Sequence, residues 1–119
     1  MDAESIRDLF GALGPIRVRR MFGGQGVFLD ELMFALEAGG ELYLKADEAS
    51  FGSFREAGSR QFFYMKQGRP MPLNFWRLPD SGVDDPDEAA RWGRLAVAAA
   101  RRAAAAKNSV KKKWAKRGS

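Results

Sequence analysis

The side chains able to do chemistry in this chain are mainly charged ones, because the sequence contains neither histidine nor cysteine. Histidine is the commonest general base and metal ligand, and cysteine supplies thiolates for nucleophilic attack and for zinc. Their absence excludes zinc sites, Ser-His-Asp triads and Cys-His pairs built from one chain. We therefore predict a protein that is not an enzyme and has no cofactor, and we interpret its charged clusters as binding groups.

The largest group of cations lies at the C-terminal end. Residues 89–119 hold ten Lys and Arg and no acid, whereas residues 1–88 hold ten Lys and Arg and all fifteen acids. Lysine and arginine neutralise phosphates, while nothing in this segment indicates base-edge contacts. We predict that DNA or RNA is bound here without sequence choice. The cations assigned to this role are Arg101, Arg102, Lys107, Lys111, Lys112, Lys113, Lys116 and Arg117.

Other interpretations of this basic segment stay open. The run can keep an otherwise acidic body in solution, or it can fold back onto the acids of that body. Trp114 among the lysines also permits contact with an anionic membrane surface, since each nearby lysine is attracted by about 1 kcal/mol. One tryptophan offers little area for insertion, so we rank the membrane below nucleic acid.

A second basic group, Arg17, Arg19 and Arg20, precedes the glycine-rich stretch 23–26. Arg17 and Arg19 would form one row on a strand that binds an anion or an acidic partner. We favour the alternative, which is a solvated strand face or an internal ion pair between Arg20, on the inward row, and one of the fifteen acids. The glycines could cradle phosphate through backbone N–H groups, but the Gly-Lys-Ser/Thr ending and the following helix are missing, so we expect a turn or bulge.

Acids gather around Pro86, at Asp84, Asp85, Asp87 and Glu88. A calcium loop alternates its acids with other residues and ends in a distal bidentate Glu, which is not the spacing here. A helix start explains the cluster better, with Asp85 as N-cap, Pro86 at N1 and Glu88 at N3. We therefore predict no metal site.

Some aromatic residues in the second half of the chain could form a stacking surface, namely Phe62, Phe63, Tyr64 and Trp76. Aromatic rings on an exposed sheet can stack on nucleic-acid bases. In a small sheet, aromatics more often belong to the core, and only outward-facing ones could stack. We favour the core.

Hydrophobic periodicity and turn residues predict the elements that position these groups. A helix over 2–13 ends at Gly14-Pro15, and a second short helix is expected between Asp47 and Gly58. The last helix begins at Asp85, with Trp92, Leu95, Ala96 and Ala99 facing inward. The predicted strands are 16–22, 27–29, 33–37, one around 42–46, 62–66 and 71–78. This order, α-β4-α-β2-α, indicates an α+β fold with an antiparallel sheet.

The length of 119 residues fits one domain. We predict that residues 1–106 form it and that residues 107–119 are a flexible basic tail. The N-terminus lacks the apolar segment of a signal peptide, and no stretch reaches the ~20 apolar residues of a membrane span. A cytoplasmic location is the resulting expectation.

Several blocks in this order are similar to the N-terminal domain of the TfoX family, which is named for regulators of bacterial competence for DNA uptake. They are Arg19-Arg20-Met21-Phe22-Gly23-Gly24 followed by Gly26, Met33-Phe34-Ala35-Leu36, Glu41-Leu42-Tyr43-Leu44-Lys45, and the stretch from Gly68-Arg69-Pro70 to Phe75-Trp76-Arg77-Leu78-Pro79. With the acid-capped helix they cover roughly residues 5–102.

The resemblance implies a two-layer α+β fold like that of secretion chaperones, and a role as a transcriptional co-activator. It brings no catalytic residues. Many members carry a second, helical domain, which we expect this chain to lack, with the basic tail in its place. Our hypothesis is a non-enzymatic regulatory or adaptor domain that binds a protein partner or itself as a homodimer and touches nucleic acid through its tail. The alternative is a chaperone-like, dimeric protein-interaction module with no nucleic-acid role.

Overall fold

The computed structural model describes residues 1–21 and 23–117, and side chains up to residue 108. Within these residues, the helices and strands follow one another as α1 (Ala3–Phe10), β1 (Arg17–Met21), β2 (Gly24–Leu29), β3 (Leu32–Ala38), β4 (Glu41–Lys45), α2 (Phe51–Glu56), β5 (Gln61–Lys66), β6 (Arg69–Arg77) and α3 (Pro86–Arg117). Short 3₁₀ helices, η1 (Gly11–Leu13) and η2 (Asp80–Gly82), precede β1 and α3. The predicted α+β class with an antiparallel sheet is confirmed.

The strands pair antiparallel in the spatial order β1-β2-β3-β4-β6-β5. The turn from β3 to β4 uses Gly39 and Gly40, whose φ angles are 60° and 83°. A two-residue hairpin turn of the primed type needs positive φ at both positions, which glycine adopts without strain. The meander from β1 to β4 therefore follows from local turn chemistry, and β6 then adds beside β4.

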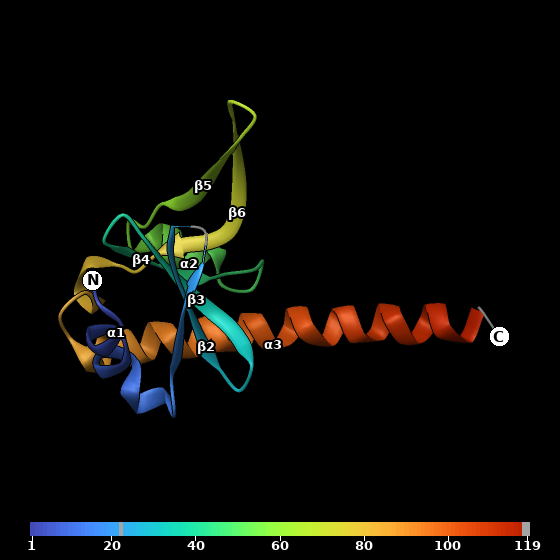
Figure 1. Cartoon of the computed structure of the whole chain (residues 1–119), viewed down its shortest axis with the longest axis horizontal. Coiled ribbons are helices and arrows are strands. Elements are labelled where there is room, and N and C mark those ends of the chain that lie inside the picture. The colour runs from blue at the N-terminus through green and yellow to red at the C-terminus, as the bar shows by residue number, and fades with distance from the viewer. Residues whose placement is uncertain (22, 118–119) are drawn as a thin grey trace.

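One face of the sheet is covered by helices (Figure 1). Helix α3 packs against β3 and β4, and α1 packs beside α3. Phe10 and Phe34 meet edge to face, with ring centroids 5.4 Å apart, in the centre of this core. The short α2 enters it through Phe54, whose ring lies 4.9 Å from that of Trp92 on α3.

Strand β2 begins earlier than expected, at Gly24, so the prediction of a turn or bulge over 23–26 is wrong for most of that stretch. The glycines serve close packing of strands. A Cβ at Gly24 would overlap the carbonyl oxygen of Glu37 on β3, and one at Gly26 would lie 2.5 Å from the sulfur of Met21 on β1. The backbone N–H groups of this stretch belong to the sheet and not to a phosphate-binding loop.

The inward stripe of α3 differs at one predicted position. Trp92, Ala96 and Ala99 are buried, but Leu95 is 37% exposed. Gly93 lies on the buried side, because a Cβ there would come within 2.7 Å of Leu13. The helix approaches its neighbours through small residues, and this closeness, rather than a row of large side chains, sets which face turns inward.

We predict that Gly24→Ala lowers the free energy of unfolding by about 1–3 kcal/mol, because the added methyl forces β2 and β3 apart. Urea denaturation monitored by circular dichroism measures the change. Gly11→Ala is the matched control, since a Cβ at Gly11 has nothing within 4 Å. Equal stability of the Gly24 variant and the wild type would contradict the close-packing role.

Candidate nucleic-acid and partner-binding surfaces

The basic segment is positioned by α3, whose start matches the prediction. One carboxylate oxygen of Asp85, Oδ1, accepts hydrogen bonds from the backbone N–H groups of Asp87 (3.0 Å) and Glu88 (3.4 Å). Glu88 also pairs with Arg91, one turn further on. The acid cluster is thus a helix cap, and among the described residues no group of three or more acids is placed to hold a metal ion.

Two of the predicted phosphate-binding arginines contact acids of the body. Arg102 donates two hydrogen bonds to Asp47, from Nε at 2.7 Å and from Nη2 at 3.0 Å. Arg101 lies 3.7 Å from the carboxylate of Asp30 in the turn between β2 and β3. These ion pairs hold the last packed turn of α3 against the body. The two arginine side chains therefore already have acidic partners within the chain.

The Arg102 guanidinium holds the pKa of the Asp47 carboxyl below its usual value, mainly through this hydrogen bond. Burial opposes the shift, while the backbone N–H of Ala49 and the hydroxyl of Ser50 add to it. The carboxylate is therefore fully charged at neutral pH. It contributes stability above its ordinary pKa and loses that contribution as the pH falls through the lowered one.

Beyond Ala103, α3 leaves the body and continues as a helix to Arg117 (Figure 1). The side chain of Lys107 is exposed. The backbone of Lys111, Lys112, Lys113, Lys116 and Arg117 is helical, and their side chains lie outside the described residues. The structure thus separates the eight predicted cations into two engaged with the body and six on the projecting segment, while the boundary and flexibility predicted for the tail stay predictions.

The β1 arginines do not form one cluster. Arg17 and Arg19 lie on the sheet face away from the helices, opposite Phe28 and Gly26 of β2. Arg17 stacks over the Phe28 ring at 5.1 Å and lies 3.8 Å from Glu31. Arg20 points to the helix-bearing face, as predicted.

The expected internal ion pair of Arg20 does not appear among the described residues, because its side chain is exposed beside the N-terminus. The face assignment was right, but β1 is an edge strand and its end extends past the helices. The inward row there meets solvent instead of the core.

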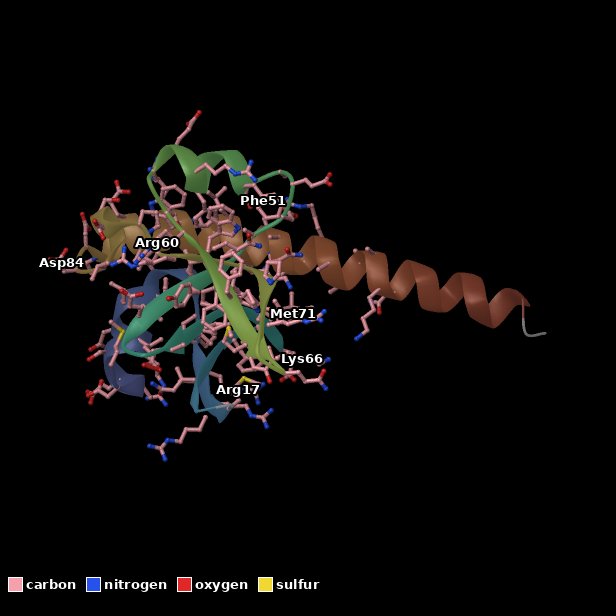
Figure 2. All side chains as sticks on the ribbon, turned by 90° about the horizontal axis from the view of Figure 1, so that it is seen from above. Arg17, Phe51, Arg60, Lys66, Met71 and Asp84 are labelled. Carbon is pink, nitrogen blue, oxygen red and sulfur yellow. The ribbon has the colours of Figure 1, made fainter. Side chains whose placement is uncertain are left out.

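Strands β5 and β6 form a two-stranded ribbon that stands away from the sheet (Figure 1). We call residues 61–73 the ribbon; Lys66 lies at its tip and Met71 along it (Figure 2). Strand β4 pairs only with residues 75–77 of β6, so the residues nearer the tip pair with β5 alone. Large apolar side chains are exposed on the ribbon, by 37–59%: Phe63, Tyr64, Met65, Met71 and Leu73.

The core interpretation of the aromatic group is therefore correct for Trp76, which is 7% exposed, and wrong for Phe63 and Tyr64. Phe62 is half-buried, with its ring 4.8 Å from that of Tyr43 on β4. Period-two counting could not show that β6 pairs with β4 only from Phe75 to Arg77. The signal in the sequence is the run Phe62 to Met65, which is apolar on both strand faces.

An apolar cleft of about 360 Å³ lies between the ribbon and the outer face of β1, β2 and β3. We define it by its large lining side chains, Met21, Met33, Leu36, Phe62, Tyr64 and Leu73. Glu37 and Gln25 also border the cleft, while the Glu37 carboxylate lies near the N-terminus, 3.9 Å from the Met1 amino group, and accepts a hydrogen bond from the Gly40 N–H at 3.1 Å. Sequence reasoning missed this cleft, because its walls come from strands far apart in the chain.

Polar contacts anchor the base of the ribbon. The Tyr43 hydroxyl donates to Glu41 at 3.0 Å, and Arg77 pairs with both Glu41 (3.3 Å) and Asp80 (2.7 Å). Burial, and then the bond to Glu41, raise the pKa of the Tyr43 phenol. The Ser59 hydroxyl donates to the carbonyl of Arg77 at 2.6 Å, tying the start of β5 to the end of β6.

Comparison with known proteins agrees with this architecture. The TfoX N-terminal domain family matches residues 8–100. The chain belongs to the TfoX N-terminal domain family. Protein Sxy of Escherichia coli (strain K12) is 33% identical over 75 residues, which cover 63% of this chain and 36% of that protein. DNA transformation protein TfoX1 of Aliivibrio fischeri is 33% identical over 68 residues, or 57% of this chain and 32% of that protein.

The TfoX N-terminal domain match includes the whole sheet, the ribbon and the cleft. It ends at residue 100, so the fastening arginines 101 and 102 and the projecting half of α3 lie outside it. The chain spans about a third of the length of the two relatives. Among the described residues, none of the helices combines the length and apolar character that a bilayer crossing needs.

We predict that Arg102→Gln raises the pKa of Asp47 toward its usual 3.8, because the charged hydrogen-bond donor is lost. An NMR titration of side-chain carboxyl carbons measures this shift. The variant should also unfold at lower urea than the wild type at pH 7, and the difference should shrink as the pH falls through the lowered pKa of Asp47, because the carboxyl is then protonated in both proteins. Arg101→Gln, which removes the neighbouring contact, should leave the Asp47 pKa unchanged. An unaltered Asp47 pKa in the Arg102 variant would contradict the fastening role.

Proposed function

We propose that this chain is a non-enzymatic regulatory or adaptor domain that acts in the cytoplasm and contacts DNA or RNA without sequence choice through the projecting half of α3. Family membership supports the regulatory part. The name of the Aliivibrio fischeri relative, DNA transformation protein TfoX1, associates that protein with DNA transformation. The folded domain would bind a protein partner, and the helix would hold the assembly on nucleic acid.

One observation carries the nucleic-acid part: α3 continues past its last contact with the body as a helix that has no acid from residue 89 onward. Residues 103–117 extend about 22 Å at 1.5 Å per residue. That length carries six cations: Lys107, Lys111, Lys112, Lys113, Lys116 and Arg117. The backbone of this segment projects from the body, which supports contact of the segment with an anionic partner.

The helix chemistry fits a cationic end. Four consecutive alanines, residues 103–106, favour the helical state, and the cations that follow lie near its C-terminus, where the helix dipole is negative. Mutual repulsion of the lysines opposes this stabilisation. Phosphates along a nucleic acid would relieve the repulsion, so binding and helix formation should reinforce each other.

We predict that the intact chain binds a 20-base-pair DNA duplex with a dissociation constant of about 10⁻⁴ to 10⁻⁶ M, nearly independent of sequence. If six phosphates are neutralised, the log–log plot of affinity against salt should have a slope near −5. Fluorescence anisotropy over 50–200 mM salt measures both quantities. The triple variant Lys111→Gln, Lys112→Gln, Lys113→Gln should reduce the slope by about half.

A 1–106 truncation completes the test, since it removes all six cations and should not bind. Intact protein that ignores DNA at 50 mM salt would refute the nucleic-acid role. Equal binding by intact and truncated chains would move the site to the outer face of β1, where Arg17 and Arg19 lie.

A second function, a protein-interaction or chaperone-like module with no nucleic-acid role, is favoured by the exposed apolar ribbon. Contiguous apolar surface of this kind marks protein interfaces. The two functions differ in whether the basic helix takes part. Sedimentation of the intact chain at several concentrations shows whether the interaction is with a second copy, as a dimeric module requires.

A further inference from the structure

The ribbon exposes large apolar side chains although few other strands support it. An isolated two-stranded hairpin is marginally stable in water, and this one extends beyond the strands that support it. Phe63 is 54% exposed and Met65 is 59% exposed on one ribbon face, while Tyr64 and Met71 are a cross-strand pair on the other. A covering partner would bury this surface and hold the ribbon in place.

The apolar cleft continues this surface inward. Tyr64 and Leu73 belong to both, because each lines the cleft while remaining partly exposed. On the opposite wall, Met33 and Leu36 are half-buried. Methionine adapts its shape to different neighbours, which suits a surface that accepts a foreign side chain. A segment seated here would place apolar side chains in the cleft and continue along the ribbon.

The charged side chains near the ribbon tip are all basic. Residues 57–79 contain four Lys and Arg and no acid, in a body whose net charge over residues 1–88 is −5. Arg77 is paired at the ribbon base, while no ion pair among the described residues involves Arg60, Lys66 or Arg69. An acidic partner would neutralise these cations.

The register places two of these cations where a bound segment would pass. Tyr64 pairs with Met71, and Lys66 pairs with Arg69 two residues nearer the tip. Strand residues two apart share a face, so Lys66 and Arg69 lie on the same ribbon face as the cleft-lining Tyr64. Apolar anchors in the cleft and acids beside the tip therefore belong to one continuous contact.

Other occupants fit less well. Nucleic acid needs cations along its path, but the large side chains that line the cleft are methionine, leucine and aromatic residues, and no Lys or Arg lines it. A second copy paired through β5 would offer no acid to the ribbon cations, because residues 57–79 of that copy also lack acids. A small molecule could fill 360 Å³, yet it would leave Phe63, Met65 and Met71 uncovered.

We propose that the apolar cleft and the ribbon form a docking site for an acidic, amphipathic segment of a partner protein. Apolar side chains of the segment enter between Leu36 and Leu73, and its carboxylates pair with Lys66 and Arg69. The docking site rests on the adaptor function proposed above and gives that function its partner chemistry.

The probe is a phage-displayed library of random 12-residue peptides selected against the intact chain. The enriched sequences should combine Asp or Glu with Leu, Ile, Phe or Trp. A fluorescein-labelled peptide of the consensus sequence is then titrated by anisotropy. Leu73→Glu, which places a charge in the cleft wall, should weaken its binding about tenfold or more.

Charge reversal tests the acidic half of the proposal. The pair Lys66→Glu and Arg69→Glu should weaken the peptide about tenfold, with the loss shrinking at high salt. The matched control is Arg7→Glu with Arg94→Glu, which makes the same charge change at exposed positions on α1 and α3 and should alter binding less than about twofold. Circular dichroism melts show whether each variant is folded.

Several outcomes would overturn the docking site. They are a selection with no enriched peptide, a consensus without acids, or unchanged binding to the folded Leu73 or Lys66/Arg69 variants. A dimer that Leu73→Glu dissociates would assign the surface to a second copy, and loss of duplex DNA binding in that variant would assign it to nucleic acid. Failure of the docking site with DNA binding intact leaves the nucleic-acid function standing, so the two proposals fail separately.

Discussion

The close contact of α3 with the sheet is the constraint on which the rest of the structure depends. Helix α3 touches β3, β4, α1 and both 3₁₀ helices, and it does so largely through small residues. Gly93 admits Leu13, while Ala96 and Ala100 are buried against the sheet side of the core. Large residues at these positions would lift the helix away and open the core. Most of the large apolar side chains of the core, such as Phe10 and Phe34, come from other elements, while α3 adds Trp92 and Val97.

Because all three described helices contribute to one core, the opposite sheet face has only the ribbon to cover it. Phe62 packs against Tyr43 at one place on this face, and toward Met33 and Leu36 the ribbon leaves the apolar cleft. The same bend that lifts β6 off β4 also exposes both faces of the ribbon tip. Cleft and exposed ribbon are thus two consequences of one geometric fact, namely that β6 pairs with β4 over only its last residues.

Local signals predicted what depends on neighbours in the chain. The cap at Asp85, the turn at Gly39 and Gly40 and the apolar stripe of α1 all follow from short-range chemistry, and the α+β class follows from them. Predictions that needed long-range placement were less accurate. Leu95 fits a helical stripe but lies outside the actual contact face, and Phe63 fits a core strand but lies beyond its support. The family resemblance correctly identified the domain, and neither it nor periodicity revealed a cleft made by strands that are distant in sequence.

The contacts of Arg101 and Arg102 divide the C-terminal cations into those that pair with the body and those on the projecting part of α3. Their ion pairs to Asp30 and Asp47 satisfy body acids and end the packed part of α3. The next four residues, 103–106, are alanines with no large apolar group to bury, so this part of the helix has no packing reason to stay against the body. The cations that follow are therefore held away from the fifteen acids of residues 1–88 by the stiffness of the helix rather than by sequence distance alone. Bending the segment back toward these carboxylates would require α3 to break.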